Sequence, residues 1–347
     1  GLVLPINLSL YTRVKASVRD DNVIRVTSNH FRRTESFRID NIAPSSSPVW
    51  VDYVKGIVAE LQSDGLIIRG ADLLIDGDIP IGGGLSSSAS LELAIGKALL
   101  GIEGSTMDAR KLARICQRAE KKYAGVSCGI MDQQSIACGR EGQAMLLDCQ
   151  SMETKFVKIP TDLSLIVINS GIKHNLSESG YNDRSEECHT AAGLLQGADP
   201  SIRSLRDASI TLVNKEKRRL GDLLYRRAYH VVTEIERTLA AFVALSNQNI
   251  ELLGSLISAS HASLRDDFEV SCQEMDALVE IADCCEGVYG TRMVGAGFGG
   301  CALSIVDASA AEPVIEEISS SYRNLIGNKP WVHTVKPAKA AMEVAGL

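Results

Sequence analysis

Residues 80–92, PIGGGLSSSASLE, join three consecutive glycines to three consecutive serines, just before a pattern typical of a helix. Glycine lets the backbone approach an anion closely and adopt positive φ angles. Serine hydroxyls and the free amides at the start of a helix donate hydrogen bonds, and the helix dipole favours negative charge there. A flexible linker is the alternative, but linkers are not normally joined to a strand and an apolar helix. The segment therefore predicts a phosphate-binding loop.

The helix expected after this loop has one apolar face. That face is predicted to contain Leu91, Ala94, Ile95, Ala98 and Leu99. The loop has no GxxxxGK[ST] pattern and no lysine after its glycines, so backbone amides and hydroxyls must hold the phosphate.

The composition is that of an ordinary globular protein. The chain has 347 residues, of which 45% are apolar and 23% charged, and its net charge is −7. This length favours two domains, which we expect at residues 1–160 and 161–347. The acidic balance disfavours a nucleic-acid partner, and the basic run at 215–219 is predicted to be a solvated helix face. No apolar run reaches the roughly 18 residues of a membrane helix, so no membrane partner is expected.

The nine cysteines are scattered and form no CxxC pair, which is typical of reduced thiols in the cytoplasm. The six histidines show no spacing typical of zinc sites. The first residues, GLVLPINLSLYTRV, form a strand pattern without an initiator methionine. We therefore expect the sequence to be the remainder of a longer protein.

Strand patterns dominate the first half, together with helices predicted at 51–63 and 107–123. The second half is mostly helical, with a long periodic segment from Leu220 to Leu245. Its predicted inward residues are Leu223, Leu224, Ala228, Val231, Val232, Ile235 and Leu239.

Two acidic residues are candidates for chemistry. Glu120 lies at the border of the apolar stripe of the 107–123 helix. It is a candidate oxygen ligand for a magnesium ion, and the alternative is an exposed glutamate on the helix surface. Asp132, within GVSCGIMDQQ (125–134), follows a glycine and two apolar residues. It is a candidate to accept or orient a hydroxyl proton, with a helix cap as the alternative.

A second glycine-rich segment, GAGFGG at 295–300, matches the GxGxxG pattern of dinucleotide-binding folds. Such folds require a helix after the glycines, whereas CALSIV predicts a strand. We therefore predict a glycine loop packed against a ligand or another loop.

Five segments, in order, resemble the galactokinases of the GHMP sugar-kinase superfamily. They are PIGGGLSSSASLE, GVSCGIMDQ, HNLSESGYNDRSEEC, SLRDDFEVSC and RMVGAGFGGC. The resemblance covers essentially the whole chain. It implies an α+β fold of two lobes, the first S5-like and the second ferredoxin-like, with the active site in the cleft between them.

The resemblance also implies site residues. Binding of the ATP phosphates is implied for Gly82, Gly83, Gly84, Ser86, Ser87 and Ser88. Ser88 and Glu120 would hold Mg²⁺, and Trp50 would lie near the adenine. Asp132 would lie beside the reacting sugar hydroxyl, with Gly129 and Tyr181 in contact with the sugar. The third motif would line the site with Gly295, Gly297 and Gly299. Arg265, Asp266 and Asp267 match another family block, for which we expect a structural role.

One family motif is missing from this sequence. Galactokinases carry a segment resembling GRVNLIGEHTDYNGG immediately before the stretch that corresponds to GLVLP, and it supplies an arginine and several sugar ligands. The sequence leaves open whether the protein lacks this motif or carries it ahead of Gly1. A chain truly beginning at Gly1 is expected to be nearly inactive.

The implied activity is transfer of the ATP γ-phosphoryl group to the anomeric hydroxyl of galactose by a cytoplasmic, monomeric enzyme. A kinase for N-acetylgalactosamine, a heptose, galacturonate or mevalonate is one alternative. A non-catalytic sensor of galactose and ATP is another, although the serine loop is intact.

Overall fold

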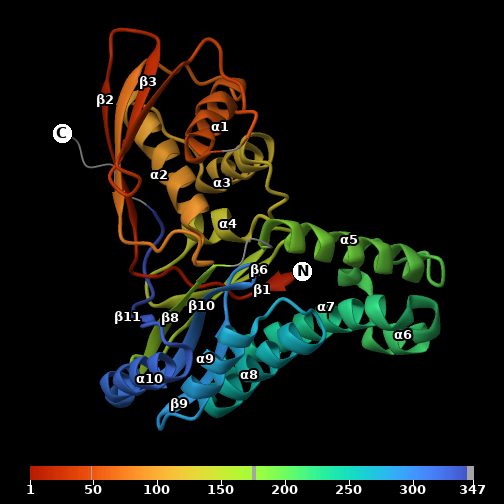
Figure 1. Cartoon of the computed structure of the whole chain (residues 1–347). Helices are drawn as coiled ribbons and strands as arrows, with labels where there is room; N and C mark the ends of the chain where they lie inside the picture. Colours follow the sequence, from red (N-terminus) through yellow and green to blue (C-terminus); the bar gives the residue numbers. More distant parts are fainter. Residues whose placement is uncertain (48, 174–176, 342–347) are drawn as a thin grey trace. The chain divides into compact units, whose positions relative to one another are not determined.

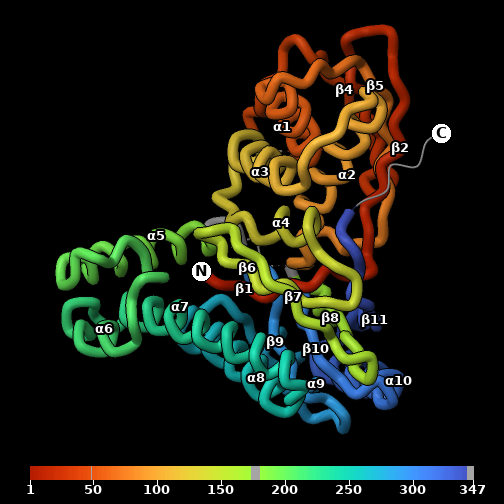
Figure 2. Tube along the Cα trace, turned by 180° about the vertical axis from the view of Figure 1, so that it is seen from behind, coloured from red at the N-terminus to blue at the C-terminus, as the bar shows by residue number. Residues whose placement is uncertain are grey.

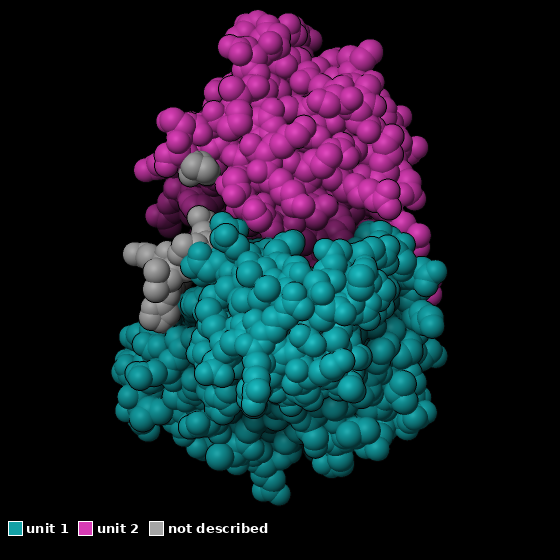
Figure 3. All heavy atoms as spheres, turned by 90° about the vertical axis from the view of Figure 1, so that its right-hand side faces the viewer, with its two compact units in different colours: residues 1–4, 82–85, 144–336 teal, residues 5–81, 86–143, 337–347 magenta. Residues whose placement is uncertain are grey.

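The computed structural model describes residues 1–47, 49–173 and 177–341, whose helices and strands can be followed in Figures 1 and 2. The chain divides into two compact units, which are coloured separately in Figure 3. Unit 1 contains residues 1–4, 82–85 and 144–336, and unit 2 contains residues 5–81, 86–143 and 337–347. The chain thus passes between units after residues 4, 81, 85, 143 and 336. The boundary expected near residue 160 stays a prediction.

Unit 2 is built on a four-stranded sheet with the order β2-β5-β3-β4. Its strands are β2 (Thr12–Val18), β3 (Val23–Ser28), β4 (Arg33–Arg38) and β5 (Ala71–Gly77). β3 and β5 are parallel, whereas the other two pairs are antiparallel. Side chains of β5 alternate between fully and partly buried positions because successive residues of a strand point to opposite faces.

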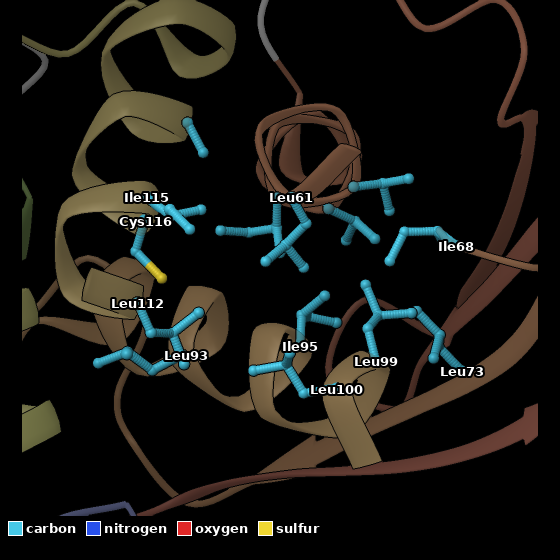
Figure 4. Packing of buried hydrophobic residues seen from close by; sticks show 14 of the residues in the cluster. Leu61, Ile68, Leu73, Leu93, Ile95, Leu99, Leu100, Leu112, Ile115 and Cys116 are labelled. Carbon is cyan, nitrogen blue, oxygen red and sulfur yellow. The ribbon is translucent and has the colours of Figure 1, made fainter. Parts of the chain in front are cut away.

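The helices of unit 2 are α1 (Trp50–Ser63), α2 (Ser87–Ile102), α3 (Ala109–Ala119), the π-turn η1 (Glu120–Ala124) and α4 (Met131–Cys138). α1, α2 and α3 point apolar side chains toward one another in a common core, as Figure 4 shows. This core includes Leu61, Leu73, Leu93, Ile95, Leu99, Leu112 and Ile115. The core therefore holds α2, and with it the loop that precedes α2, in a defined place.

The predicted inward face of α2 is only partly correct. Ile95 and Leu99 are buried, but Leu91, Ala94 and Ala98 are only partly buried. The residues that the structure buries also include Glu92, Leu93, Gly96 and Leu100. The reason is that α2 contacts β2, α1, α3 and α4, so more than one side of the helix is covered.

The predicted helix over 107–123 forms α3 and then continues as the π-turn η1. The apolar stripe expected for this helix consists of Leu112, Ile115, Cys116, Ala119 and Tyr123. The first four are buried, and Tyr123 is partly buried. Glu120, expected at the border of that stripe, is buried. Its carboxylate accepts a hydrogen bond from Gln133 of α4.

Unit 1 contains a small sheet, β1-β6-β7, and a larger one, β11-β8-β10-β9. The small sheet consists of β1 (Leu2–Val3), β6 (Gln143–Asp148) and β7 (Thr154–Lys158). The larger sheet consists of β8 (Leu163–Lys173), β9 (Val288–Met293), β10 (Gly299–Asp307) and β11 (Trp331–Val335). All its pairs are antiparallel. With helices between β8 and β9 and between β10 and β11, this is the ferredoxin-like βαββαβ topology.

The helices of unit 1 are α5 (Ser177–Gln196), α6 (Ile210–Lys215), α7 (Lys217–Ser246), α8 (Ile250–Asp266), α9 (Gln273–Asp283) and α10 (Ala311–Ile326). Two 3₁₀ turns, η2 (Leu205–Asp207) and η3 (Ala308–Ala310), precede α6 and α10. α9 and α10 bury their apolar faces against the larger sheet in a second core. None of the helices in the described part of the chain has the length and apolar character needed to cross a bilayer.

The predicted inward face of the 220–245 segment is wrong at two positions. Leu223 and Leu239 are 44% and 43% exposed. Arg227, by contrast, is 1% exposed. The helix starts again after Gly221, whose φ of 68° is not helical. An apolar periodicity cannot reveal this buried arginine, because its burial depends on acidic partners elsewhere in the chain.

Candidate active site

The glycine–serine segment is a loop that runs into the N-terminus of α2. Gly82 and Gly84 have φ angles of 71° and 77°, and Ser86, at the N-cap of α2, is also left-handed with φ of 55°. The first amides of a helix have no partners within it, and the dipole adds positive charge at this end. The observed loop therefore has the backbone geometry that suits an anion. Residues 82–85 belong to unit 1, and Ser86 onward belongs to unit 2.

Within unit 1, the two glycine loops touch through their backbones. A Cβ atom on Gly84 would lie 2.9 Å from the carbonyl oxygen of Val294, and one on Gly295 would lie 2.6 Å from the Cα of Gly84. A Cβ on Gly300 would lie 2.8 Å from the carbonyl oxygen of Gly83. The GAGFGG segment is followed by strand β10 and not by a helix. These contacts confirm a loop packed against another loop and exclude a dinucleotide-binding turn.

Asp132, in the first turn of α4, is hydrogen-bonded to the hydroxyl of Ser86, at the N-cap of α2. Burial raises the pKa of the Asp132 carboxyl, the Ser86 hydrogen bond lowers it, and the charge of Glu120 raises it further. The net pKa is above the ordinary value. A carboxylate with a raised pKa accepts a proton more readily near neutral pH.

Glu120 belongs to a buried polar cluster that joins three helical elements. The Gln133 side-chain amide donates to Glu120 Oε2 at 2.7 Å and to Glu92 Oε2 at 3.1 Å. The exposed fractions are 0% for Glu92, 5% for Glu120 and 1% for Gln133. Burial, followed by the charge of Glu120, raises the pKa of Glu92 well above its usual range. The Glu92 carboxyl group in this cluster therefore keeps its proton more readily than an ordinary glutamate.

The geometry of α2 brings Ser88 toward the same cluster. Ser88 and Glu92 are four residues apart, and residues with this spacing are neighbours on one helix face. Because Glu92 is bridged to Glu120 through Gln133, the helix spacing predicts that Ser88 lies on the side of α2 that faces Glu120. A hydroxyl and a carboxylate are the hard oxygen donors that suit Mg²⁺, which takes few protein ligands when phosphates are present. The residues therefore fit a magnesium ion that accompanies a nucleotide.

Among residues 1–47, 49–173 and 177–341, no group of three or more His, Cys, Asp or Glu side chains is placed to hold a metal ion.

Two domain families match this chain. Residues 52–140 match the GHMP kinases N terminal domain, and residues 241–324 match the GHMP kinases C terminal domain. A galactokinase of Chloroflexus aggregans is 40% identical over 322 residues, covering 93% of this chain and 83% of the relative. A galactokinase of Roseiflexus sp. is 37% identical over 336 residues, covering 97% of this chain and 86% of the relative. The chain belongs to the galactokinases of the GHMP kinase family.

The known structures agree with this family membership. The crystal structure of Lactococcus lactis galactokinase complexed with galactose matches with a TM-score of 0.95 and 33% identity, over 99% of this chain and 90% of that one. A mevalonate kinase of Methanococcus jannaschii, at 17% identity and a TM-score of 0.67, shares the fold alone. The expected family and the expected two-lobed α+β fold are therefore confirmed.

The other residues expected in the site of this GHMP kinase lie at defined places within their own units. Trp50 is the first residue of α1, and its ring stacks on Phe31 with centroids 5.6 Å apart and planes 19° apart. Gly129 precedes α4, and a Cβ there would meet no atom within 4 Å. The space beside Gly129 is therefore open.

In unit 1, Tyr181 lies in α5, directly after Gly180. A Cβ on Gly180 would lie 2.5 Å from the ring of Phe298. The segment of α5 next to Tyr181 therefore packs against the loop that contains Gly295, Gly297 and Gly299. Residues 174–176 of the HNLSESGYNDRSEEC segment lie outside the described residues.

The Arg265–Asp266–Asp267 block forms local contacts. Arg265 Nε pairs with Asp266 Oδ1 at 2.8 Å, and Ser263 donates its hydroxyl to Asp267 Oδ2 at 2.7 Å. These contacts lie at the C-terminal end of α8.

Sequence reasoning missed Glu92 and Gln133. Both carried a signal: Glu92 is four residues after Ser88, and Gln133 directly follows Asp132. Neither signal is specific without the fold, because a helical glutamate and a helical glutamine are ordinarily exposed.

Proposed function

We propose that this protein transfers the γ-phosphoryl group of ATP to the anomeric hydroxyl of galactose, with galactose 1-phosphate and ADP as products. The hydroxyl oxygen forms the new bond to the γ-phosphorus, and the bond from that phosphorus to the β–γ bridging oxygen breaks. The bridging oxygen leaves with ADP. The hydroxyl proton passes to Asp132 or is oriented by it during the transfer.

The observation that carries this proposal is the Ser86–Asp132 hydrogen bond. It joins the first serine of the predicted phosphate loop to the predicted acceptor of the hydroxyl proton. Phosphoryl transfer needs the attacking hydroxyl and the phosphate side by side and in line. Galactose as the acceptor is supported by the galactokinases that resemble this chain over most of their length.

The phosphates are assigned to the backbone and hydroxyls of Gly82–Gly84 and Ser86–Ser88. The left-handed glycines and the N-terminus of α2 support this assignment. We assign the sugar to Asp132, Gly129 and Tyr181, and the adenine to Trp50. Gly295, Gly297 and Gly299 shape the loop that packs on Gly84, so they affect phosphate binding through the backbone.

Ser88 and Glu120 are assigned to Mg²⁺. When bound, the ion would neutralise charge on the phosphates. Glu120 provides the single protein carboxylate and Ser88 a hydroxyl, which leaves the remaining positions to phosphate and water.

A sugar panel with coupled detection of ADP tests this proposal. Galactose is expected to be the best substrate, with galactose 1-phosphate identified by mass and by loss of the reducing end. A higher kcat/KM for N-acetylgalactosamine, a heptose or galacturonate would reassign the acceptor. Binding of galactose and ATP without turnover would favour a sensor.

We also infer that the protein acts in the cytoplasm as a monomer. All nine cysteines are free thiols, which is typical of a reducing compartment. Fractionation of source cells and the mass of the purified protein in solution test the two parts of this inference separately.

A further inference from the structure

Gln133 connects the carboxyl groups of two helical elements inside unit 2. Both protons of its amide are used, one toward Glu120 and one toward Glu92. The three side chains come from α4, from the junction of α3 with η1, and from α2. All three are almost fully buried, so water cannot easily replace these contacts.

This arrangement leaves polar atoms without partners. The side-chain amide oxygen of Gln133 (Oε1) and the Oε1 atom of Glu92 are buried, and neither has a hydrogen-bond partner within the described residues. An unpaired buried polar atom is costly, and apolar side chains of similar size would avoid that cost. The cluster is therefore poorly explained by stability alone.

The contact to Glu120 gives a better explanation. A glutamate side chain has three rotatable bonds, and Glu120 begins a π-turn, where the regular α-helical packing of side chains ends. The Gln133 amide binds one oxygen of its carboxylate at 2.7 Å. Glu92 accepts the other amide proton and thereby sets the rotation of the amide. Residues that orient a metal ligand in this way commonly affect metal affinity.

We propose that Gln133 and Glu92 are positioning residues for Glu120: the Gln133 amide, anchored on Glu92, holds the Glu120 carboxylate where it binds the divalent cation of the nucleotide. This proposal rests on the proposed function, which assigns Glu120 to that cation. Gln133 acts directly on Glu120, and Glu92 acts through Gln133. Glu92 therefore needs only a side-chain oxygen that accepts a hydrogen bond.

The probe is Mn²⁺, whose binding to the protein with a non-hydrolysable ATP analogue is followed by electron paramagnetic resonance. Gln133→Met removes both hydrogen bonds and is expected to weaken Mn²⁺ binding by about 10- to 100-fold. Glu92→Met frees the amide and is expected to weaken it by about tenfold. Glu92→Gln keeps an acceptor oxygen and should restore binding to within about twofold of the original protein.

Gln134→Met is the matched control. Gln134 is the next residue of α4 and is equally buried, but its amide donates to Cys138 Sγ at 3.3 Å. Its substitution removes a buried amide without touching Glu120, so Mn²⁺ affinity should not change. Thermal unfolding without ligand shows that each variant is folded. If Gln133→Met does not fold, the pair Glu92→Met and Glu92→Gln still provides the test.

A kinetic measurement separates positioning from a general structural effect. In Gln133→Met, the Mg²⁺ concentration for half-maximal rate should rise by the factor found with Mn²⁺, while kcat at saturating Mg²⁺ stays within about threefold.

Mn²⁺ binding that is unchanged in Gln133→Met, or equally weak in Glu92→Gln and Glu92→Met, overturns the proposal. Unchanged binding in Glu120→Gln would remove the cation role itself from the proposed function, and the positioning role with it. Weakened binding in Glu120→Gln alone would leave the cation role intact and refute only the positioning.

Discussion

The hydroxyl of Ser86 is hydrogen-bonded to the carboxyl group of Asp132, which links the N-terminus of α2 to the first turn of α4. The interaction lowers the pKa of Asp132, against a larger increase that burial causes. One side chain of the glycine–serine loop therefore influences the protonation state of the group that we assign to the attacking hydroxyl.

Asp132→Asn should keep the shape of the side chain and lose its ability to accept a proton. We expect kcat to fall by about 10²- to 10⁴-fold, the usual contribution of a general base. Galactose binding, measured by calorimetry, should persist. Turnover at the original rate would remove Asp132 from the chemical step.

Ser86→Ala should shift the pH dependence of the reaction. A carboxyl group accepts a proton only when ionised, so the acid limb of kcat against pH reports the pKa of Asp132 in the substrate complex. Because Ser86 lowers this pKa, its removal should move the acid limb to higher pH. Rates at saturating ATP between pH 5 and pH 8 provide the measurement, with Ser87→Ala as the control. An acid limb that stays in place, or moves to lower pH, would contradict the assignment.

Glu92→Gln should stabilise the protein, more so at higher pH. The pKa of Glu92 is raised in the folded protein. Below the unfolded-state pKa, about 4.3, both states are protonated and the group has no effect on stability. Above it, the unfolded chain loses the proton first, so the free energy of unfolding falls until the folded-state pKa is reached.

The neutral amide of Glu92→Gln removes this dependence on pH. Urea unfolding of both proteins at pH 4, 6 and 8 should show a difference in stability that grows from pH 4 to pH 8. A difference that is the same at all three values would mean that Glu92 ionises normally in the folded state.

Gly84→Ala should strain the contact between the two glycine loops. The residue has φ of 77°, and an added Cβ would lie 2.9 Å from the carbonyl oxygen of Val294. We expect a loss of about 1–3 kcal/mol in the free energy of unfolding and weaker nucleotide binding. Gly193→Ala, in the exposed part of α5 with no atom within 4 Å of the new Cβ, should instead stabilise by about 0.5–1 kcal/mol. Equal effects of the two changes would rule out the strain argument.

Arg227→Met should destabilise unit 1 strongly. This arginine pairs with Glu187 and Glu269, each at 2.6 Å, and donates to the carbonyl of Asp267. Its removal leaves acidic groups without their buried partner, at an expected cost of about 3–5 kcal/mol. Arg226→Met is the control because Arg226, 40% exposed, also pairs with Glu269; it should cost at most about 1 kcal/mol. Chemical unfolding measures both, and a small loss for Arg227→Met would show that the network is well solvated.

Local patterns predicted the elements of the candidate site well. The glycine–serine loop followed by a helix is present as residues 82–86 and α2, and the strand after GAGFGG is β10. The stripe of the 107–123 helix is buried at Leu112, Ile115 and Cys116. These features follow from short-range physics: glycine permits left-handed backbone, and apolar residues at helical spacing form one face.

Long-range contacts explain where these predictions failed. α2 is covered by β2 and by three helices, so Glu92 is buried on a side that the pattern left to solvent. Arg227 is buried because Glu187 and Glu269, 40 and 42 residues away, surround it. Leu223 and Leu239 stay exposed on the same helix. Periodicity shows which side chains share a face, but it does not show how many faces are covered.

The sequence by itself determined the family and the glycine–serine loop, and it predicted roles for Glu120 and Asp132, because these depend on motifs whose residue types match a chemistry. Only the tertiary structure decided that Gln133 holds Glu120, that Ser86 is bonded to Asp132 and that Gly84 touches Gly295. The first two contacts depend on how α2, η1 and α4 pack within unit 2, and the third depends on how the two glycine loops pack within unit 1. A contact between distant segments depends on the packing of the whole unit, which no local pattern contains.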